Sequence, residues 1–485
     1  MSVSRHTSYN LIGSIIPLLG SLITVPIYVH LIGPARYGVL AIAWLLLGYF
    51  GLFDLGLGRA TSFRISALRE ASAEARANTF WAAIIVNLGM GVIGAAILWL
   101  GADYFFAHMF KVEETLRPEI MASVPLLALS VPIATLSGVL TGALQGREQF
   151  LQTNVISVIS AAMFQLLPLW VVWQMGPNLV QVLSAAVLAK VLTMAALALG
   201  CHLALTRGQP IRLDRREAPM LLKYGGWITL TSLFGPMLVI VDRFVIGAVL
   251  GAVAVAIYTI PYQLAKQIQI LPSALTNALF PKISAATAEE QTAYSRNATF
   301  ALVSLISLPV LGAIFLLEPA LQLWVGKSMG GQAAPVGRIL LVGFWANAFA
   351  MIPYTGLQAS GRPDLVTKML LIEIPPYFLI LYLGLTYFGV SGAALALAVR
   401  SVIDYCLLSW VAKKGFAGWP VLTANLVLLT IGAFIAGVTS INDWRWWAGA
   451  LAVGSIMLTL AWLNAPTDVR SRLANFRPHL SRKPA

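Results

Sequence analysis

Charged residues are scarce in this chain, and their scarcity excludes the soluble proteins. Only 11% of the 485 residues are Asp, Glu, Lys or Arg, whereas an ordinary soluble domain carries about a quarter. Hydrophobic residues make up 59% of the chain, and the mean hydropathy is +0.81. The apolar stretches are too many and too long to form the core of a soluble domain. The composition therefore predicts an all-α polytopic membrane protein.

Cysteine and clustered histidine are also lacking. The two cysteines, Cys201 and Cys406, fall in predicted helices, and the five histidines are scattered without metal-ligand spacing. We therefore expect no disulfide framework, no metal site and no cofactor other than a coupling proton or sodium ion. A glycine pattern at residues 89–94 (GMGVIG) lies inside an apolar span, without the preceding strand that a dinucleotide site requires. No catalytic constellation emerges, and the connections are too short for a catalytic domain, so the chain is predicted not to be an enzyme.

Apolar runs predict about fourteen membrane spans, and the basic residues predict their orientation. Most of the 32 lysines and arginines fall in loops on one side, which the positive-inside rule places in the cytoplasm together with both termini. The net charge of +13 then faces anionic lipid headgroups, which leaves no need for a nucleic-acid partner. The predicted spans are residues 11–31, 39–58, 80–100, 121–143, 155–174, 180–205, 227–250, 253–274, 299–317, 338–358, 369–388, 391–411, 421–439 and 446–463.

The chain contains an internal repeat. Residues 141–147 (TGALQGR) resemble residues 355–362 (TGLQASGR), and their Gly-Arg pairs are 215 positions apart. Each half has six spans in the same orientation, so the repeat is parallel and predicts two six-helix bundles around a central cavity. The predicted parts are a first bundle, a cytoplasmic linker, a second bundle, two additional helices and a basic cytoplasmic tail, at residues 1–206, 207–226, 227–412, 413–465 and 466–485. The two additional helices either stabilise the packing or line a groove that faces lipid.

Three basic residues lie inside predicted spans. Lys190 and Arg400 occupy matching places in the two halves at an offset of 210, and Lys266 lies in the eighth span. A charge at the bilayer centre costs at least about 2.5–3.5 kcal/mol, so it normally faces protein or a wet cavity. We predict that these three cations line the cavity and bind an anionic substrate. For Arg400, a structural pair with Asp404 one turn later is the alternative.

Other polar side chains within spans have two interpretations each. Gln263 and Gln267 share one helix face with Lys266, and this face either lines the cavity or forms a polar seam between helices. Asp242 and Arg243 lie near the outer end of the seventh span. They either belong to the cavity or snorkel to the membrane interface.

Carboxylates within spans are the candidates for coupling to a proton or sodium gradient. They are Asp54 near the cytoplasmic end of the second span, Glu373 just before Pro375-Pro376, and Asp404 in the twelfth span. Glu373 is alternatively the acid partner of one of the three intramembrane cations. The sequence does not decide which carboxylate has which role.

Four short segments resemble a known family. Residues 28–38 (YVHLIGPARYG) and 53–56 (FDLG) look like the start of polysaccharide and O-antigen flippases, and residues 242–247 (DRFVIG) and 279–284 (LFPKIS) are similar to their second half. These flippases belong to the multidrug/oligosaccharidyl-lipid/polysaccharide exporter superfamily, and the resemblance covers essentially the whole chain. It implies two six-helix bundles, commonly followed by two further helices, that alternate between inward-facing and outward-facing V shapes.

The resemblance also implies a function in lipopolysaccharide or other cell-surface polysaccharide assembly. The expected flippase turns an undecaprenyl-pyrophosphate-linked oligosaccharide from the cytoplasmic to the outer leaflet of the bacterial cytoplasmic membrane. The three intramembrane cations would counter the pyrophosphate charge, while the prenyl tail stays among membrane lipids. A glycan polymerase complex is a further candidate partner. The alternatives are a lipid II flippase and a cation-coupled drug antiporter of the same superfamily, and the mid-span cations argue against the antiporter.

Overall fold

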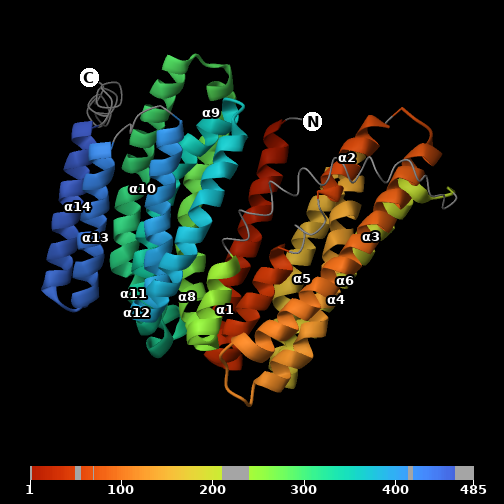
Figure 1. Ribbon diagram of the computed structural model, residues 1–485, viewed down its shortest axis with the longest axis horizontal. Helices are drawn as coiled ribbons and strands as arrows, with labels where there is room; N and C mark the ends of the chain where they lie inside the picture. The colour runs from red at the N-terminus through yellow and green to blue at the C-terminus, as the bar shows by residue number, and fades with distance from the viewer. Residues whose placement is uncertain (1–2, 50–55, 69, 210–239, 413–418, 465–485) are drawn as a thin grey trace, which may run out of the picture. The chain divides into compact units, whose positions relative to one another are not determined.

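The computed structural model describes residues 3–49, 56–68, 70–209, 240–412 and 419–464, and every regular element in these ranges is a helix (Figure 1). Ten of the helices are long and apolar enough to cross a membrane. Large apolar side chains are exposed along them, with Leu323 at 90% and Tyr387 at 76%, as expected where lipid replaces water around the protein. The predicted all-α polytopic fold is confirmed.

Contacts divide the chain into two units, residues 1–259 and 260–485, and the division falls inside α8 (Ala252–Ala265). Residues 240–259, which the sequence assigns to the second bundle, therefore belong to the first unit. The bundle boundaries expected at residues 206 and 227 remain a prediction, because residues 210–239 lie outside the described ranges.

The first unit contains the helices that surround the candidate site. They are α1 (Val3–Tyr49), α2 (Leu57–Ala67), α3 (Ala73–Tyr104), η2 (Phe105–Met109), α4 (Arg117–Gly146), α5 (Phe150–Met175), α6 (Leu179–Cys201), η3 (His202–Thr206), a helix over residues 240–250, and the first part of α8. The core of this unit lies where α2, α3, α4 and α6 meet, around Ile65, Phe80, Leu144 and Leu197.

The second unit continues from α8 to the end of the described chain. It comprises η4 (Lys266–Gln269), α9 (Ile270–Ala285), α10 (Ala288–Val325), α11 (Lys327–Ala359), α12 (Pro363–Val411), α13 (Trp419–Val438) and α14 (Trp444–Asn464). The last two helices pack on each other and on α10. They therefore have at least the packing role considered from the sequence.

Two of the long helices each combine two predicted spans. α1 contains a non-helical Gly33, with φ 77°, and α12 contains a non-helical Gly389, with φ 59°. Glycine lacks a Cβ and adopts these positive φ values without strain. The chain therefore reverses at each glycine, between spans one and two and between spans eleven and twelve.

α2 is a finding that the sequence did not predict, because residues 59–79 were expected to be a loop. Its side chains Leu57, Ala60 and Ile65 are buried. A Cβ added at Gly142 of α4 would lie 2.0 Å from the carbonyl oxygen of Gly58, so the α2 and α4 backbones are in direct contact. Such close approach is typical of small residues in membrane helices. Hydropathy missed α2 because the helix is short and carries arginines on its other face.

The repeat has a register different from the one expected. α4 and α11 end in the same way, with Gln149 N–H donating to Leu144 O and Arg362 N–H donating to Leu357 O. The left-handed residues Glu148 and Gly361 are 213 positions apart, as are the positive-φ glycines Gly176 and Gly389. The sequence comparison used an offset of 215 for the Gly-Arg pairs and 210 for Lys190 and Arg400, whereas all these structural points are 213 apart. Lys190 and Arg400 are therefore displaced by three residues within the repeat.

These helix ends make a testable prediction. Glu148 adopts φ 61° where the second half of the repeat has Gly361, and a left-handed conformation costs a residue with a Cβ about 1 kcal/mol. Glu148→Gly should therefore be more stable than Glu148→Ala by about 1 kcal/mol. Both changes remove the same carboxylate, so the comparison isolates the backbone effect. Thermal unfolding in detergent measures it, and equal melting temperatures would contradict the prediction.

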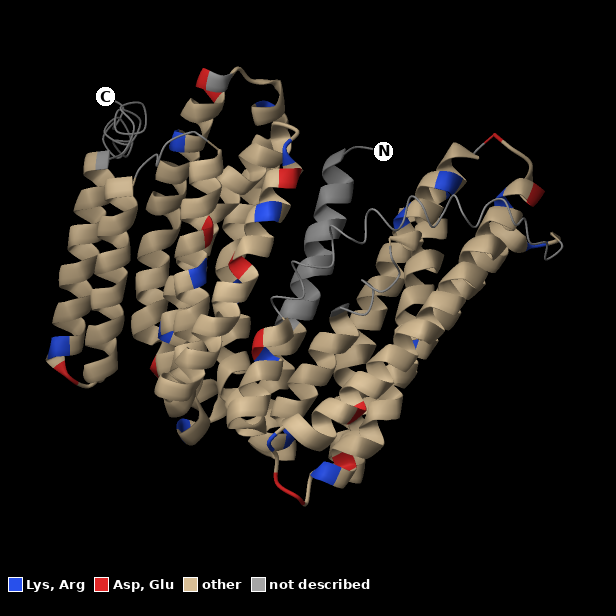
Figure 2. Cartoon of the chain, in the orientation of Figure 1, with Lys and Arg blue, Asp and Glu red and all other residues tan. Residues whose placement is uncertain are grey.

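The charges of both units gather mainly toward the helix ends, and the long middle stretches carry few (Figure 2). Each charge within a span is therefore a candidate for a specific role, because it bears the desolvation cost described above.

Candidate functional site

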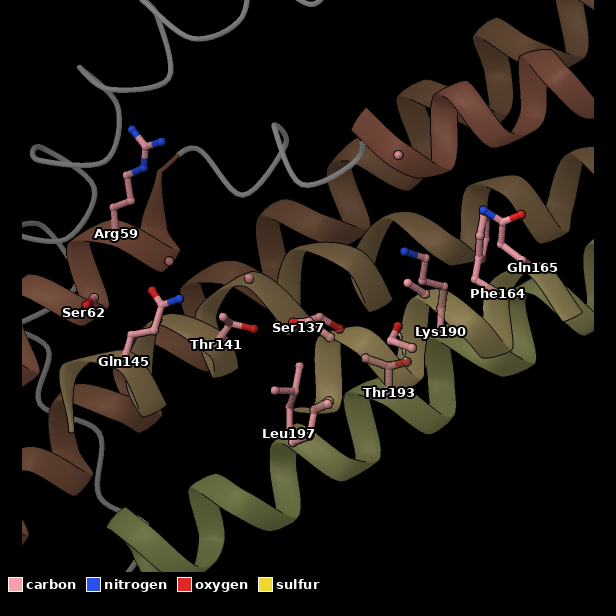
Figure 3. A pocket seen from close by; sticks show the side chains of 18 of the residues that line it. Arg59, Ser62, Ser137, Thr141, Gln145, Phe164, Gln165, Lys190, Thr193 and Leu197 are labelled. Carbon is pink, nitrogen blue, oxygen red and sulfur yellow. Dashed lines mark hydrogen bonds between the residues drawn. The ribbon is translucent and has the colours of Figure 1, made fainter. Parts of the chain in front are cut away.

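A groove of about 820 Å³ lies in the first unit (Figure 3). We call it the N-unit groove. Its lining comes from α2, α4, α5 and α6, with Gly48 of α1 at its edge. Glycines keep part of its wall free of side chains, including the Gly58 and Gly142 pair at the contact of α2 with α4.

One face of α4 supplies a row of neutral polar groups. Ser137, Thr141 and Gln145 follow one another at intervals of four residues and all line the groove, because residues four apart share one helix face. Ser137 donates to the carbonyl oxygen of Ile133 at 2.7 Å. Within the described part of the chain, the side chains of Thr141 and Gln145 have no hydrogen-bond partner. They are therefore available to a ligand rich in hydroxyl groups.

Two cations lie in the same groove. Lys190 of α6 is partly buried, and its Nζ atom lies 4.9 Å from the ring centroid of Phe164, a cation–π contact. Arg59 of α2 is exposed at the other end of the labelled row (Figure 3). No Asp or Glu occurs among the described lining residues. The described lining thus carries two basic side chains and no acidic one, which suits an anionic, hydrophilic ligand.

Hydrogen bonds hold the walls of the groove in place. The Thr193 and Ser160 hydroxyls are 2.7 Å apart and join α6 to α5. At the Lys190 end, Thr24 donates to Gln165 Oε1 at 2.7 Å, and the Tyr28 hydroxyl donates to the Gln165 carbonyl oxygen at 3.0 Å. These contacts fix α5, which carries Phe164, against α1.

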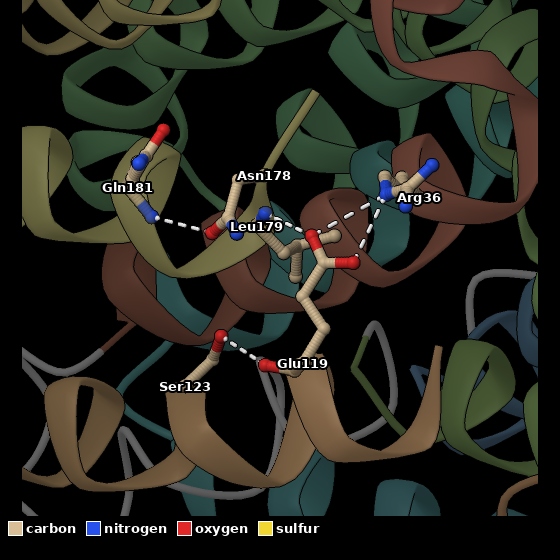
Figure 4. Close-up of polar contacts among 6 residues, drawn as sticks. All are labelled: Arg36, Glu119, Ser123, Asn178, Leu179 and Gln181. Carbon is tan, nitrogen blue, oxygen red and sulfur yellow. Dashed lines mark hydrogen bonds and ion pairs between the residues drawn. The ribbon is translucent and has the colours of Figure 1, made fainter. Parts of the chain in front are cut away.

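A second set of contacts positions α6 and therefore Lys190 (Figure 4). Nε of Arg36 lies 3.1 Å and 3.3 Å from the two carboxylate oxygens of Glu119. The same carboxylate accepts a hydrogen bond from the backbone N–H of Leu179, the first residue of α6. Asn178 caps the helix by accepting from Gln181 N–H at 3.2 Å. An acceptor at a helix N-terminus is favourable because the first N–H groups lack partners within the helix.

The structure excludes one of the two interpretations of Asp242 and Arg243. Both are only 1% exposed and cannot snorkel to an interface. Arg243 Nη1 lies 2.8 Å from Asp242 Oδ1, Tyr258 donates to Asp242 Oδ2 at 2.9 Å, and the guanidinium lies 5.2 Å from the Tyr258 ring centroid. Snorkelling fails because neighbouring helices cover both side chains, which hydropathy alone does not reveal. The pair joins the 240–250 helix to α8 within the first unit.

The second unit contains a cluster of charges across the Gly389 break. Glu373, 2% exposed, lies before the break, and Arg400 lies after it with its Nε 3.3 Å from a Glu373 carboxylate oxygen. Asp404, one turn after Arg400 on the same helix, interacts electrostatically with the Glu373 and Arg400 pair. Tyr377 lies under the guanidinium at 5.4 Å. Arg400 therefore forms its ion pair with Glu373, whereas the alternative considered from the sequence was a pair with Asp404.

The remaining predicted residues fall in different surroundings. Lys266 is exposed in η4, and Gln267 Nε2 donates to the backbone oxygen of Gln263 at 2.9 Å. Asp54 lies outside the described residues. Lys190 and Arg400 belong to different units, so a cavity shared by the three cations stays a prediction.

Comparisons with known proteins identify the family. Residues 3–287 match the family described as polysaccharide biosynthesis protein, which is more than half of the chain. The chain belongs to this family. It is also 28% identical, over 85% of its own length and 98% of the relative's, to a Shigella flexneri protein named Putative O-antigen transporter.

Solved structures of low sequence identity share the fold of this family member. A lipid II flippase MurJ in an inward closed conformation has a TM-score of 0.71 at 13% identity, covering 94% of this chain and 98% of that one. An inward-facing multidrug resistance MATE family transporter of the MOP superfamily has a TM-score of 0.67 at 16% identity, covering 86% and 98%. The family resemblance and the superfamily fold predicted from the sequence are confirmed.

The sequence pointed to Lys190 but missed the rest of the N-unit groove. Arg59 falls between the predicted spans 39–58 and 80–100, where no helix was expected. The α4 row did carry a signal, since Ser137, Thr141 and Gln145 repeat at intervals of four in an apolar span. A search for polar residues at helical spacing would have found it.

Proposed function

We propose that this protein is a flippase that moves an undecaprenyl-diphosphate-linked oligosaccharide from the cytoplasmic to the outer leaflet by alternating access. Membership of the polysaccharide biosynthesis family and the similarity to a protein named as an O-antigen transporter support the substrate class. The proposed location is the bacterial cytoplasmic membrane with both termini inside. A glycan polymerase complex is the proposed partner, and no step of this transport requires an enzymatic reaction.

The observation that carries this proposal is the N-unit groove, with two cations and no acid among its described lining residues. A diphosphate loses strong hydration when it leaves water, and charge-assisted hydrogen bonds from cations offset that loss. The Thr141 and Gln145 side chains can replace water around sugar hydroxyls. A groove for drug cations would instead require acidic or aromatic walls, so the cations favour the glycan carrier over the antiporter.

Coupling to an ion gradient is proposed for the Glu373, Arg400 and Asp404 cluster. One guanidinium balances only one of the two carboxylates, and two carboxyls close to a single cation in a buried place favour a shared proton. Lys266, with Gln263 and Gln267, is proposed to contribute to the cavity on the second unit. The coupling role of the cluster and the cavity role of Lys266 were both considered from the sequence, and both belong to the transport cycle proposed above.

Glu373→Gln should remove the response of transport to an imposed proton or sodium gradient. The amide keeps the shape of the carboxyl, but it is neutral. It therefore cannot take up and release a proton, and it offers no negative charge to a sodium ion. Transport by the variant in proteoliposomes is expected to be equal with and without a gradient, whereas wild-type transport should rise several-fold. Glu289→Gln, an exposed change at the start of α10, is the control. Unchanged gradient dependence in Glu373→Gln would remove this residue from coupling.

The function itself is tested with purified protein in liposomes. A lipid-linked oligosaccharide with a fluorescent sugar is placed in one leaflet, and an impermeant quencher reports its arrival in the other. Lipid II and a lipophilic cationic dye serve as the competing substrates. Faster movement of the lipid-linked oligosaccharide than of lipid II is expected. Movement of the dye without movement of either glycan lipid would favour the antiporter and overturn the proposal.

A further inference from the structure

The two cations of the N-unit groove are too far apart to bind one diphosphate together. α4 and α6 begin at the same end, where Glu119 accepts from Leu179 N–H, and the two helices are therefore parallel. Further along, the Cys201 thiol donates to the Leu140 carbonyl oxygen at 3.3 Å, which places these residues at one level. Lys190 is eleven residues before Cys201, which corresponds to about 16 Å along the helix.

Arg59 lies toward the C-terminal end of α4, on the far side of Leu140 from Lys190. Its neighbour Gly58 contacts Gly142, which is two residues beyond Leu140 on α4. Figure 3 shows Gln145, Thr141 and Ser137 between Arg59 and Lys190 along the groove. A compact dianion cannot reach both cations at once, so each must serve a different stage or a different group of the ligand.

The two ends also differ in exposure and in local charge. Arg59 is exposed and lies in the first turn of α2, where N–H groups and the helix dipole favour an anion. Its planar guanidinium can bind two phosphate oxygens side by side. Lys190 is partly buried beside Phe164. Its interaction with an anion is stronger, because less water screens it.

We propose that Arg59 captures the substrate diphosphate at the cytoplasmic end of the groove and that Lys190 receives it near the middle of the membrane. This inference rests on the proposed function and orientation. We call these two positions the two stations. Between them, the neutral side chains of the α4 row contact the glycan but do not bind the diphosphate. The diphosphate thus advances from an exposed cation to a buried one as the glycan lipid crosses.

The two stations predict different kinetic effects. Initial rates are measured in proteoliposomes at several membrane densities of a lipid-linked oligosaccharide. Arg59→Gln should raise KM about tenfold with kcat changed less than twofold, since it weakens capture by one exposed charge contact. Lys190→Met should instead lower kcat. Arg59→Lys is expected to recover most of the affinity, because it restores the charge.

Arg207→Gln is the matched control, because Arg207 is exposed near the end of the α6–η3 segment and does not line the groove. It should leave KM unchanged, and a rise equal to that of Arg59→Gln would indicate a general charge effect. Wild-type KM in Arg59→Gln, or a loss of kcat in both groove variants, would overturn the two-station inference while leaving the flippase function intact. Absence of transport by the wild type would instead contradict the proposed function.

Discussion

Lys190→Met is expected to lower the rate of lipid-linked oligosaccharide transport by about a hundredfold, which is close to 2.7 kcal/mol of lost stabilisation. The change keeps a flexible apolar chain of similar length and removes the charge from the partly buried end of the N-unit groove. The described groove has no carboxylate that would be left unpaired by this change. The fold should therefore remain intact, and the melting temperature in detergent should stay equal or rise.

Transport and stability together separate a binding role from a structural one. If Lys190 serves mainly to hold α5 and α6 together through its contact with Phe164, Lys190→Met should melt earlier and lose transport only in proportion to folded protein. Lys190→Arg restores the charge and should retain at least about a third of the wild-type rate. Normal transport by properly folded Lys190→Met would remove this residue from the substrate path.

Arg243→Ala is expected to lower the free energy of unfolding by about 3–5 kcal/mol, the largest stability effect proposed for this chain. Asp242 and Arg243 are each 1% exposed, and truncating the arginine leaves the aspartate buried without its cation. The carboxylate would keep two neutral donors, the Tyr258 hydroxyl at 2.9 Å and the backbone N–H of residue 243 at 2.7 Å, but it would lose its counter-charge. Denaturant or thermal unfolding in detergent measures the loss.

Two further variants test the physical reason for this effect. Tyr258→Phe removes one hydrogen bond and should cost about 1–3 kcal/mol. The double variant Asp242→Asn/Arg243→Met leaves no uncompensated charge and should be more stable than Arg243→Ala alone. A double variant as unstable as the sum of its single changes would mean that the two side chains act independently, and the ion-pair explanation would fail.

Much of the fold was predictable from the sequence, because lipid imposes a simple rule on composition. Each span must be apolar over the thickness of the bilayer, and this rule located the predicted spans, including the two pairs that α1 and α12 combine. It failed at α2, which is short, carries Arg59 and Arg64, and lies against α4 through its small residues. For Asp242 and Arg243 it left the snorkelling alternative open, which their burial excludes, since depth along a helix does not reveal which face is covered.

The candidate site was only partly predictable for the same reason. A basic residue within an apolar span can be recognised from the linear sequence, and for this reason Lys190, Lys266 and Arg400 were all found. Their surroundings depend on residues far away in the chain. Arg400 pairs with Glu373 because α12 reverses at Gly389, and α6 is positioned because Arg36 and Glu119 meet across 83 residues.

Composition and the spacing of apolar residues were thus enough to predict an all-helical membrane protein with an internal repeat. They also identified the charged side chains within spans, each of which carries a desolvation cost in the membrane. Which of those charges is neutralised and which lines a groove followed from packing, because a side chain's electrostatic environment comes from neighbours that the fold brings near. The left-handed residues at the helix ends set the true register of the repeat in the same way, since backbone conformation, not residue identity, marks equivalent positions.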